Sequence, residues 1–133
     1  MLMSDHGVNL YGNAILVSQK FAAEKPEAVK GFLRALVKGL RDTIRDPAAA
    51  VDTVIKRNDV ARKDVEVERL QMVLKQNILT PWVKENGVGG IDKARFGKAL
   101  DQIGLTFTYK SKPKTEDIFE ERFLPPPSER RVN

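Results

Sequence analysis

The sequence predicts a mainly α-helical chain with one β-strand near its N-terminus. Apolar residues recur at three- and four-residue spacing over much of the chain, most clearly over residues 26–45. Residues 8–17 alternate first and then run apolar, as a buried strand does. The length of 133 residues fits a single domain.

The expected strand covers residues 8–17, which read VNLYGNAILV. Gly12 within it suits a bulge or a close backbone approach. A lone strand cannot satisfy its own backbone donors and acceptors. Another chain, a second copy of this chain or further sequence must therefore pair with it, and we expect self-association through this strand.

Capping residues and prolines mark where successive helices begin. Ser18 and Asp46 are N-cap types, and Pro26 and Pro47 suit first helical turns. A run of three prolines from Pro125 ends the regular structure. The expected helices cover about 19–25, 26–45, 47–57, 64–76, 81–85, 92–103 and 116–122, and a disordered tail follows at 128–133.

Composition narrows the function classes. The chain has no cysteine, which excludes disulfides, thiolate metal sites and cysteine nucleophiles. Its net charge of +5 is spread along the chain, and 7% aromatic residues are too few for a base-stacking platform, so no nucleic-acid partner is expected. His6 is the single histidine, and no carboxylate pair is isolated in an apolar stretch. We therefore expect no enzyme, metal or cofactor.

No targeting or membrane segment is expected either. The first ten residues lack the basic and apolar regions of a signal peptide. No apolar run approaches the roughly 20 residues that cross a membrane.

Three other patterns have ordinary structural explanations. Ser4-Asp5-His6 holds triad residue types, but a triad needs them to converge from separate elements. Asn86–Gly90 lacks the Lys-Ser/Thr of a phosphate loop and fits a flexible connection between helices. Five cations fall in one stripe of helix 26–45, which could contact phosphates or an anionic membrane, although most such stripes are solvated faces. This basic stripe comprises Lys30, Arg34, Lys38, Arg41 and Arg45.

Asn9, Tyr11 and Asn13 are the candidate ligand-binding residues. They alternate along the predicted strand, so their side chains would share one face. Asn and Tyr both donate and accept hydrogen bonds, which suits a polar organic ligand. The other interpretation is a core strand whose polar residues face solvent.

The same region resembles a known family. Residues 11–18 (YGNAILVS), then 20–22 (KFA) and 25–35 (KPEAVKGFLRA), resemble the C-terminal portion of NMT1/THI5-like proteins. These are solute-binding proteins of ABC importers, similar to nitrate, sulfonate, taurine and thiamine-precursor receptors. The series continues with residues 46–51, 77–80 and 123–125, so the resemblance spans roughly residues 5–127.

The resemblance implies a type II periplasmic-binding-protein fold, in which two α/β lobes close about a hinge on a ligand. Residues 1–127 would be a C-terminal fragment of such a protein, beginning where the chain crosses between lobes. A strand without neighbours fits that position. The resemblance further implies that Asn9, Tyr11 and Asn13 line the interlobe cleft, and that this fragment alone binds solutes poorly.

The favoured function is therefore a solute-binding component of an ABC importer. It would bind a small polar organic or anionic solute in the periplasm and, in the full-length protein, contact an ABC permease. The alternative is a free-standing helical interaction module that uses the basic stripe. An enzyme of the thiamine-pyrimidine synthase type shares the fold, but it would need a histidine-rich site, and the single histidine argues against it.

Overall fold

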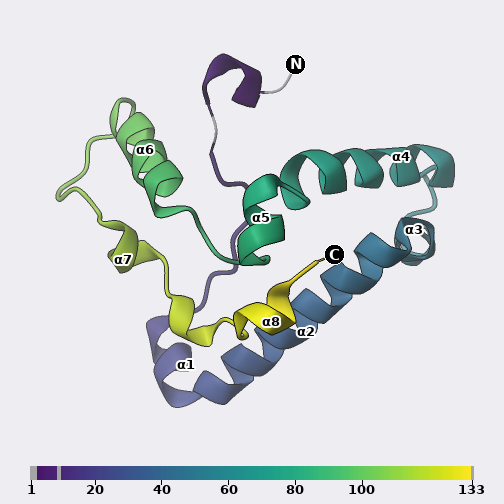
Figure 1. The fold of residues 1–133 in the computed structure, drawn as a ribbon, viewed down its shortest axis with the longest axis horizontal. Helices are drawn as coiled ribbons and strands as arrows, with labels where there is room; N and C mark the ends of the chain where they lie inside the picture. Colours follow the sequence, from purple (N-terminus) through teal and green to yellow (C-terminus); the bar gives the residue numbers. More distant parts are fainter. Residues whose placement is uncertain (1–2, 9, 133) are drawn as a thin grey trace. The chain divides into compact units, whose positions relative to one another are not determined.

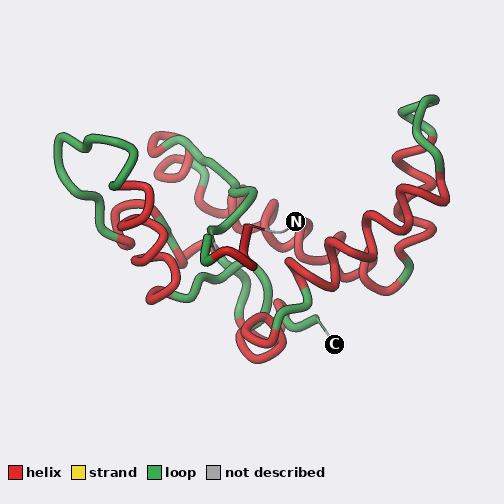
Figure 2. Tube along the Cα trace, turned by 90° about the horizontal axis from the view of Figure 1, so that it is seen from above, coloured by secondary structure: helices red, strands yellow, loops and turns green. Residues whose placement is uncertain are grey.

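The computed structural model describes residues 3–8 and 10–132 (Figure 1). The chain divides into two compact units. Unit 1 comprises residues 1–26 and 91–123, and unit 2 comprises residues 27–90 and 124–133. Throughout the described residues the regular structure is helical, and no segment is drawn as a strand in Figure 2. The prediction of a mainly helical chain is confirmed.

The predicted strand at 8–17 is wrong. The described residues of this segment form neither helix nor strand, and regular structure resumes only at Gln19. An extended segment becomes a strand only where neighbouring backbone exchanges hydrogen bonds with it. The described part of the chain supplies no such neighbour, so the alternating side chains have no sheet on which to be arranged.

In unit 1, two side-chain caps fix the starts of helices. Ser18 Oγ accepts a hydrogen bond from the Phe21 N–H at 3.2 Å. The Asp92 carboxylate accepts from the Ala94 and Arg95 N–H groups at 2.9 and 3.1 Å. Each cap satisfies amide groups that a helix start otherwise leaves unpaired. The helices of this unit are η1 (Met3–His6), α1 (Gln19–Glu24), α6 (Lys93–Gly104), α7 (Thr115–Ile118) and η3 (Glu121–Phe123).

In unit 2, the long helix α2 (Pro26–Arg45), which starts at the end of unit 1, is followed by a helical pair. Asp46 caps the next helix, α3 (Pro47–Ile55), by accepting from the Ala49 N–H at 3.0 Å. Helix α3 packs on α4 (Lys63–Val73), and the Lys63 ammonium reaches the Asp52 carboxylate at 2.6 Å. The remaining elements are a π-helical turn η2 (Leu74–Ile78), α5 (Pro81–Asn86) and α8 (Pro127–Arg130).

The C-terminal segment of unit 2, for which the sequence predicts a disordered tail at 128–133, contains a short helix and a buried valine in its described residues. Residues 127–130 form α8, and Val132 is only 4% exposed. Val132 packs with Val37 of α2 and Val88 of the loop after α5. One apolar residue among polar ones carries no periodic signal, so the sequence does not reveal this docking. The partly buried neighbours of the cluster are Leu40, Ile44, Ile78, Leu79 and Val83.

No described helix combines the length and the apolar character that crossing a bilayer requires.

Replacing Val132 with Ala should lower the free energy of unfolding by about 2 kcal/mol, because two buried methyl groups are lost and a small cavity remains. Thermal unfolding followed by circular dichroism measures the change. Val60→Ala is the matched control, since Val60 is 84% exposed. Equal stability of the two variants would contradict the docking of the C-terminal segment.

Candidate functional site

The structure places the three predicted ligand-binding residues differently. Tyr11 is half-buried against the N-terminal end of α6, whereas Asn13 is exposed. Asn9 lies outside the described residues. The structure therefore does not reproduce the common polar face that a strand would give Tyr11 and Asn13.

Tyr11 contacts α6 through both its hydroxyl and its ring. The hydroxyl oxygen accepts a hydrogen bond from the Asp92 N–H at 2.8 Å. The ring centroid lies 5.9 Å from that of Phe96, with the planes inclined at 45°. The guanidinium carbon of Arg95 lies 4.3 Å from the Tyr11 centroid, within cation–π range. We call Tyr11, Asp92, Arg95 and Phe96 the Tyr11 cluster.

Arg95 also fixes the backbone beside Tyr11. Its Nη2 donates to the Leu10 carbonyl oxygen at 3.0 Å. Farther along the same helix, Gln102 Nε2 donates to the Gly7 carbonyl oxygen at 3.1 Å. These contacts hold the N-terminal segment along α6 without a β-ladder.

The chemistry of the Tyr11 cluster suits binding. Because the Tyr11 oxygen accepts from the Asp92 amide, its own proton is available to a ligand acceptor. The Asp92 carboxylate is already engaged by the first amides of α6. The described residues contain no set of three His, Cys, Asp or Glu side chains that could hold a metal. What the cluster offers is a hydroxyl donor, a cation and aromatic surface.

The resolved pKa shifts belong to exposed ion pairs away from this cluster. A hydrogen bond from Arg62, at 2.7 Å, is the main cause that lowers the pKa of Asp64. A hydrogen bond to Asp101, at 2.5 Å, is the main cause that raises the pKa of Lys112. Both shifts follow from local pairing, and neither marks a reactive group.

The glycine-rich loop Asn86–Gly90 holds the C-terminal segment. The Val88 N–H donates to the Arg130 carbonyl oxygen at 2.9 Å, so this amide is not available to an anion. Gly87 has φ +80°, and a Cβ there would lie 2.9 Å from the Arg130 Cβ. Only glycine tolerates both this dihedral and this approach. The loop acts as a connection with a docked segment, in line with the structural interpretation of its sequence.

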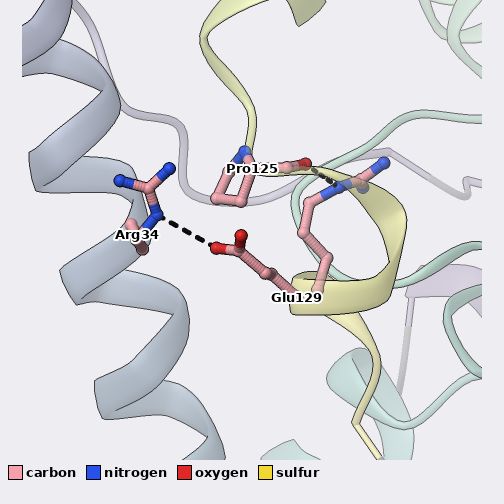
Figure 3. A network of polar contacts seen from close by, with 4 residues as sticks. Arg34, Pro125 and Glu129 are labelled. Carbon is pink, nitrogen blue, oxygen red and sulfur yellow. Dashed lines mark hydrogen bonds and ion pairs between the residues drawn. The ribbon is translucent and has the colours of Figure 1, made fainter.

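Part of the basic stripe is neutralised within unit 2. Figure 3 shows Arg34 of α2 reaching Glu129 of α8, with Nε 3.0 Å from Oε2. Lys30 pairs with Glu27 at 2.8 Å, and Arg45 pairs with Asp42. Three of the five cations thus have carboxylate partners, which reduces the field that an anionic partner would meet.

Sequence reasoning missed Arg95 and Arg130. Arg95 contacts the N-terminal segment, and Arg130 lies in the C-terminal segment and contacts the backbone of unit 2. Arg95 lies one turn inside a helix whose cap, Asp92, is visible in the sequence. Its contact with Tyr11 spans more than 80 residues and leaves no local pattern. Arg130 lies in a polar segment with no periodicity, so no sequence signal identifies it.

Comparison with known proteins supports the resemblance at the N-terminal end. Residues 1–50 match the family model described as NMT1/THI5 like. A stretch of 52 residues is 40% identical to the riboflavin-binding protein RibY of Chloroflexus aurantiacus (strain ATCC 29366 / DSM 635 / J-10-fl). That stretch is 39% of this chain and 15% of the relative. No solved structure matches the chain. The resemblance to NMT1/THI5-like proteins is thereby confirmed over residues 1–50.

Tyr11→Phe should lower the free energy of unfolding by about 1 kcal/mol, because the half-buried Asp92 amide loses its acceptor while the ring contacts remain. Faster hydrogen exchange at the Asp92 amide reports the change. Asn13→Ala, at an exposed position of the same segment, should leave that exchange unaltered. If Tyr11→Phe and Asn13→Ala exchange alike, the hydroxyl does not hold the segment on α6.

Proposed function

We propose that this chain forms part of a solute-binding protein of an ABC importer. The observation that carries the proposal is the match of residues 1–50 to the NMT1/THI5-like family model. This range includes the segment of Tyr11 and Asn13. Solute binding is the activity that the family suggests, and a non-enzymatic role is proposed on the same basis.

Tyr11 and Asn13 are the proposed solute contacts among the described residues, together with Asn9 from the sequence pattern. Exposure of the Asn13 amide and the donor capacity of the Tyr11 hydroxyl support this role. The guanidinium of Arg95, 4.3 Å from the Tyr11 centroid, adds positive charge for an anionic or electron-rich solute. The relative RibY is named as riboflavin-binding, so riboflavin is the first solute to test.

The proposed mechanism is closure around the solute in the whole protein. Contacts with a solute favour whichever arrangement binds it better, and a permease then recognises that arrangement. The permease partner and the periplasmic location are parts of the proposal that follow from the family resemblance.

The helical interaction module has less support. Such a module would use the basic stripe of α2 on an acidic partner or an anionic lipid. Three of its five cations already pair with carboxylates, and one of these pairs, Arg34–Glu129, joins α2 to α8. An added partner would have to displace these carboxylates.

Titration with riboflavin, taurine, nitrate and a pyrimidine, followed by NMR, tests solute binding. At least one solute should give shifts at residues 10–13, with a dissociation constant no tighter than about 1 mM, because this fragment alone is expected to bind solutes poorly. Asn13→Ala should weaken that binding about fivefold, because one hydrogen bond of about 1 kcal/mol is lost.

Asn58→Ala is the matched control, since Asn58 is also exposed but lies in the α3–α4 connection. The proposal fails if none of the four solutes shifts residues 10–13. It also fails if the Asn13 and Asn58 variants bind equally well.

We also propose that two copies of the chain associate along residues 13–17. Ile15, Leu16 and Val17 are 50%, 91% and 40% exposed. Residues 10–17 carry no charge, so two copies meet there without repulsion. An uncharged, apolar segment with unpaired backbone is the usual template for edge pairing.

Light scattering during gel filtration should therefore find a dimer or larger species at high concentration. Leu16→Lys should shift it towards monomer, because pairing would then bring two ammonium groups together. Leu105→Lys is the control, since Leu105 is 86% exposed in another segment. A wild-type monomer, or equal masses for the two variants, would contradict association through residues 13–17.

A further inference from the structure

The side chain of Arg130 lies beside two of the places where the chain passes from one unit to the other, which we call crossings. The chain leaves unit 2 after Gly90 and returns to it at Leu124. Arg130, in the last helix of unit 2, contacts the backbone next to both crossings. The third crossing, at residues 26–27, falls within the first turn of α2 and is held by that helix.

The guanidinium of Arg130 bridges the two connections directly. Its Nη1 donates to the Val88 carbonyl oxygen at 2.9 Å, two residues before the first crossing. Its Nε donates to the Pro125 carbonyl oxygen at 2.9 Å, one residue after the second (Figure 3). The Arg130 carbonyl oxygen in turn accepts from the Val88 N–H at 2.9 Å. Arg130 thus makes three hydrogen bonds to backbone groups next to the two connections.

The residues just beyond these bonds have close neighbours within unit 2. Gly89 has φ +85°, and a Cβ there would lie 3.2 Å from the Leu124 side chain. At Gly90, a Cβ would lie 3.0 Å from the Trp82 ring and 3.4 Å from Arg130 Nη1. The loop therefore approaches both the returning chain and the arginine closely. These close contacts within unit 2 end at Gly90.

We propose that Arg130 is a positioning residue that fixes the direction in which both connections leave unit 2. Bending of these two connections is thereby confined to residues 89–91 and 123–124. The planar guanidinium suits this role, because its donors are held at a fixed angle and can bind two carbonyl oxygens at once. A lysine ammonium at the same place would contact them without fixing their relative direction.

This role differs from general support of the C-terminal segment. Val132 anchors that segment in the apolar cluster, and Glu129 ties it to Arg34. Both contacts remain when the guanidinium is replaced. The proposal concerns only the crossings, and it does not depend on any solute.

The test compares Arg130→Gln and Arg130→Lys with the wild type and with Arg131→Gln, a neighbouring exposed arginine. Amide exchange at Val88, whose N–H donates to the Arg130 carbonyl oxygen beside the first crossing, should rise about tenfold in both Arg130 variants, while exchange within α2 stays unchanged. Because the chain has no cysteine, Lys38→Cys and Lys98→Cys place one spin label in each unit. The distribution of label distances should widen in the Arg130 variants and keep its width in Arg131→Gln.

Several results would overturn the proposal. One is a folded Arg130→Lys protein with the wild-type distance distribution. Another is a rise in exchange that is equal across α2 and the crossings, since Arg130 would then support unit 2 generally. Loss of folding in both Arg130 variants would lead to the same conclusion.

Discussion

Because apolar burial is limited, hydrogen bonds to backbone groups add to the docking of the chain ends. The buried hydrophobic side chains of the described residues are mostly small, and even Val51 and Leu100 keep 3% and 9% of their surface exposed. A small core stabilises helices that pack on each other, but it offers little to segments without helical periodicity. Such segments must satisfy their backbone groups elsewhere. Tyr11 and Arg130 provide those contacts at the two ends of the chain.

The two docking contacts use the same physical device. In unit 1, Arg95 donates to the Leu10 carbonyl, and the Tyr11 hydroxyl accepts from the Asp92 amide. In unit 2, Arg130 donates to two carbonyl groups and accepts from the Val88 amide through its own backbone. A long side chain here substitutes for the ladder partner that a strand would have. Arginine is well suited to this because its charged donors strengthen bonds to carbonyl oxygens.

Features that depend on residues nearby in the chain could be predicted from the sequence. Features that depend on residues far away in the chain could not. Ser18, Asp46 and Asp92 cap helices through bonds to amides two or three residues away, so residue type alone reveals them. The strand at 8–17 needed a neighbour that the described chain does not contain, and alternation cannot supply one. The docking of Val132 depends on residues more than 40 positions away and was equally hidden.

The candidate site was predictable to the same limited extent. Tyr11 was identified for its polar alternation with Asn9 and Asn13. The structure gives it a different setting, in which its described side-chain partners come from α6 and its N-cap Asp92. That helix lies outside the residues matched to the family model. The family match therefore covers the segment that contains Tyr11, while the structure identifies α6 as the helix that holds this segment.

The exposed run beside Tyr11 bears on how that match should be interpreted. A solvent-exposed Leu16 forgoes about 2 kcal/mol that burial would contribute, and Ile15 and Val17 forgo part of theirs. Contacts with other residues of the described chain do not recover this energy. A segment that serves only to link η1 and α1 would be polar. The apolar run lies within the residues that match the NMT1/THI5-like family. Association of two copies along residues 13–17, as proposed above, would remove this apolar surface from water.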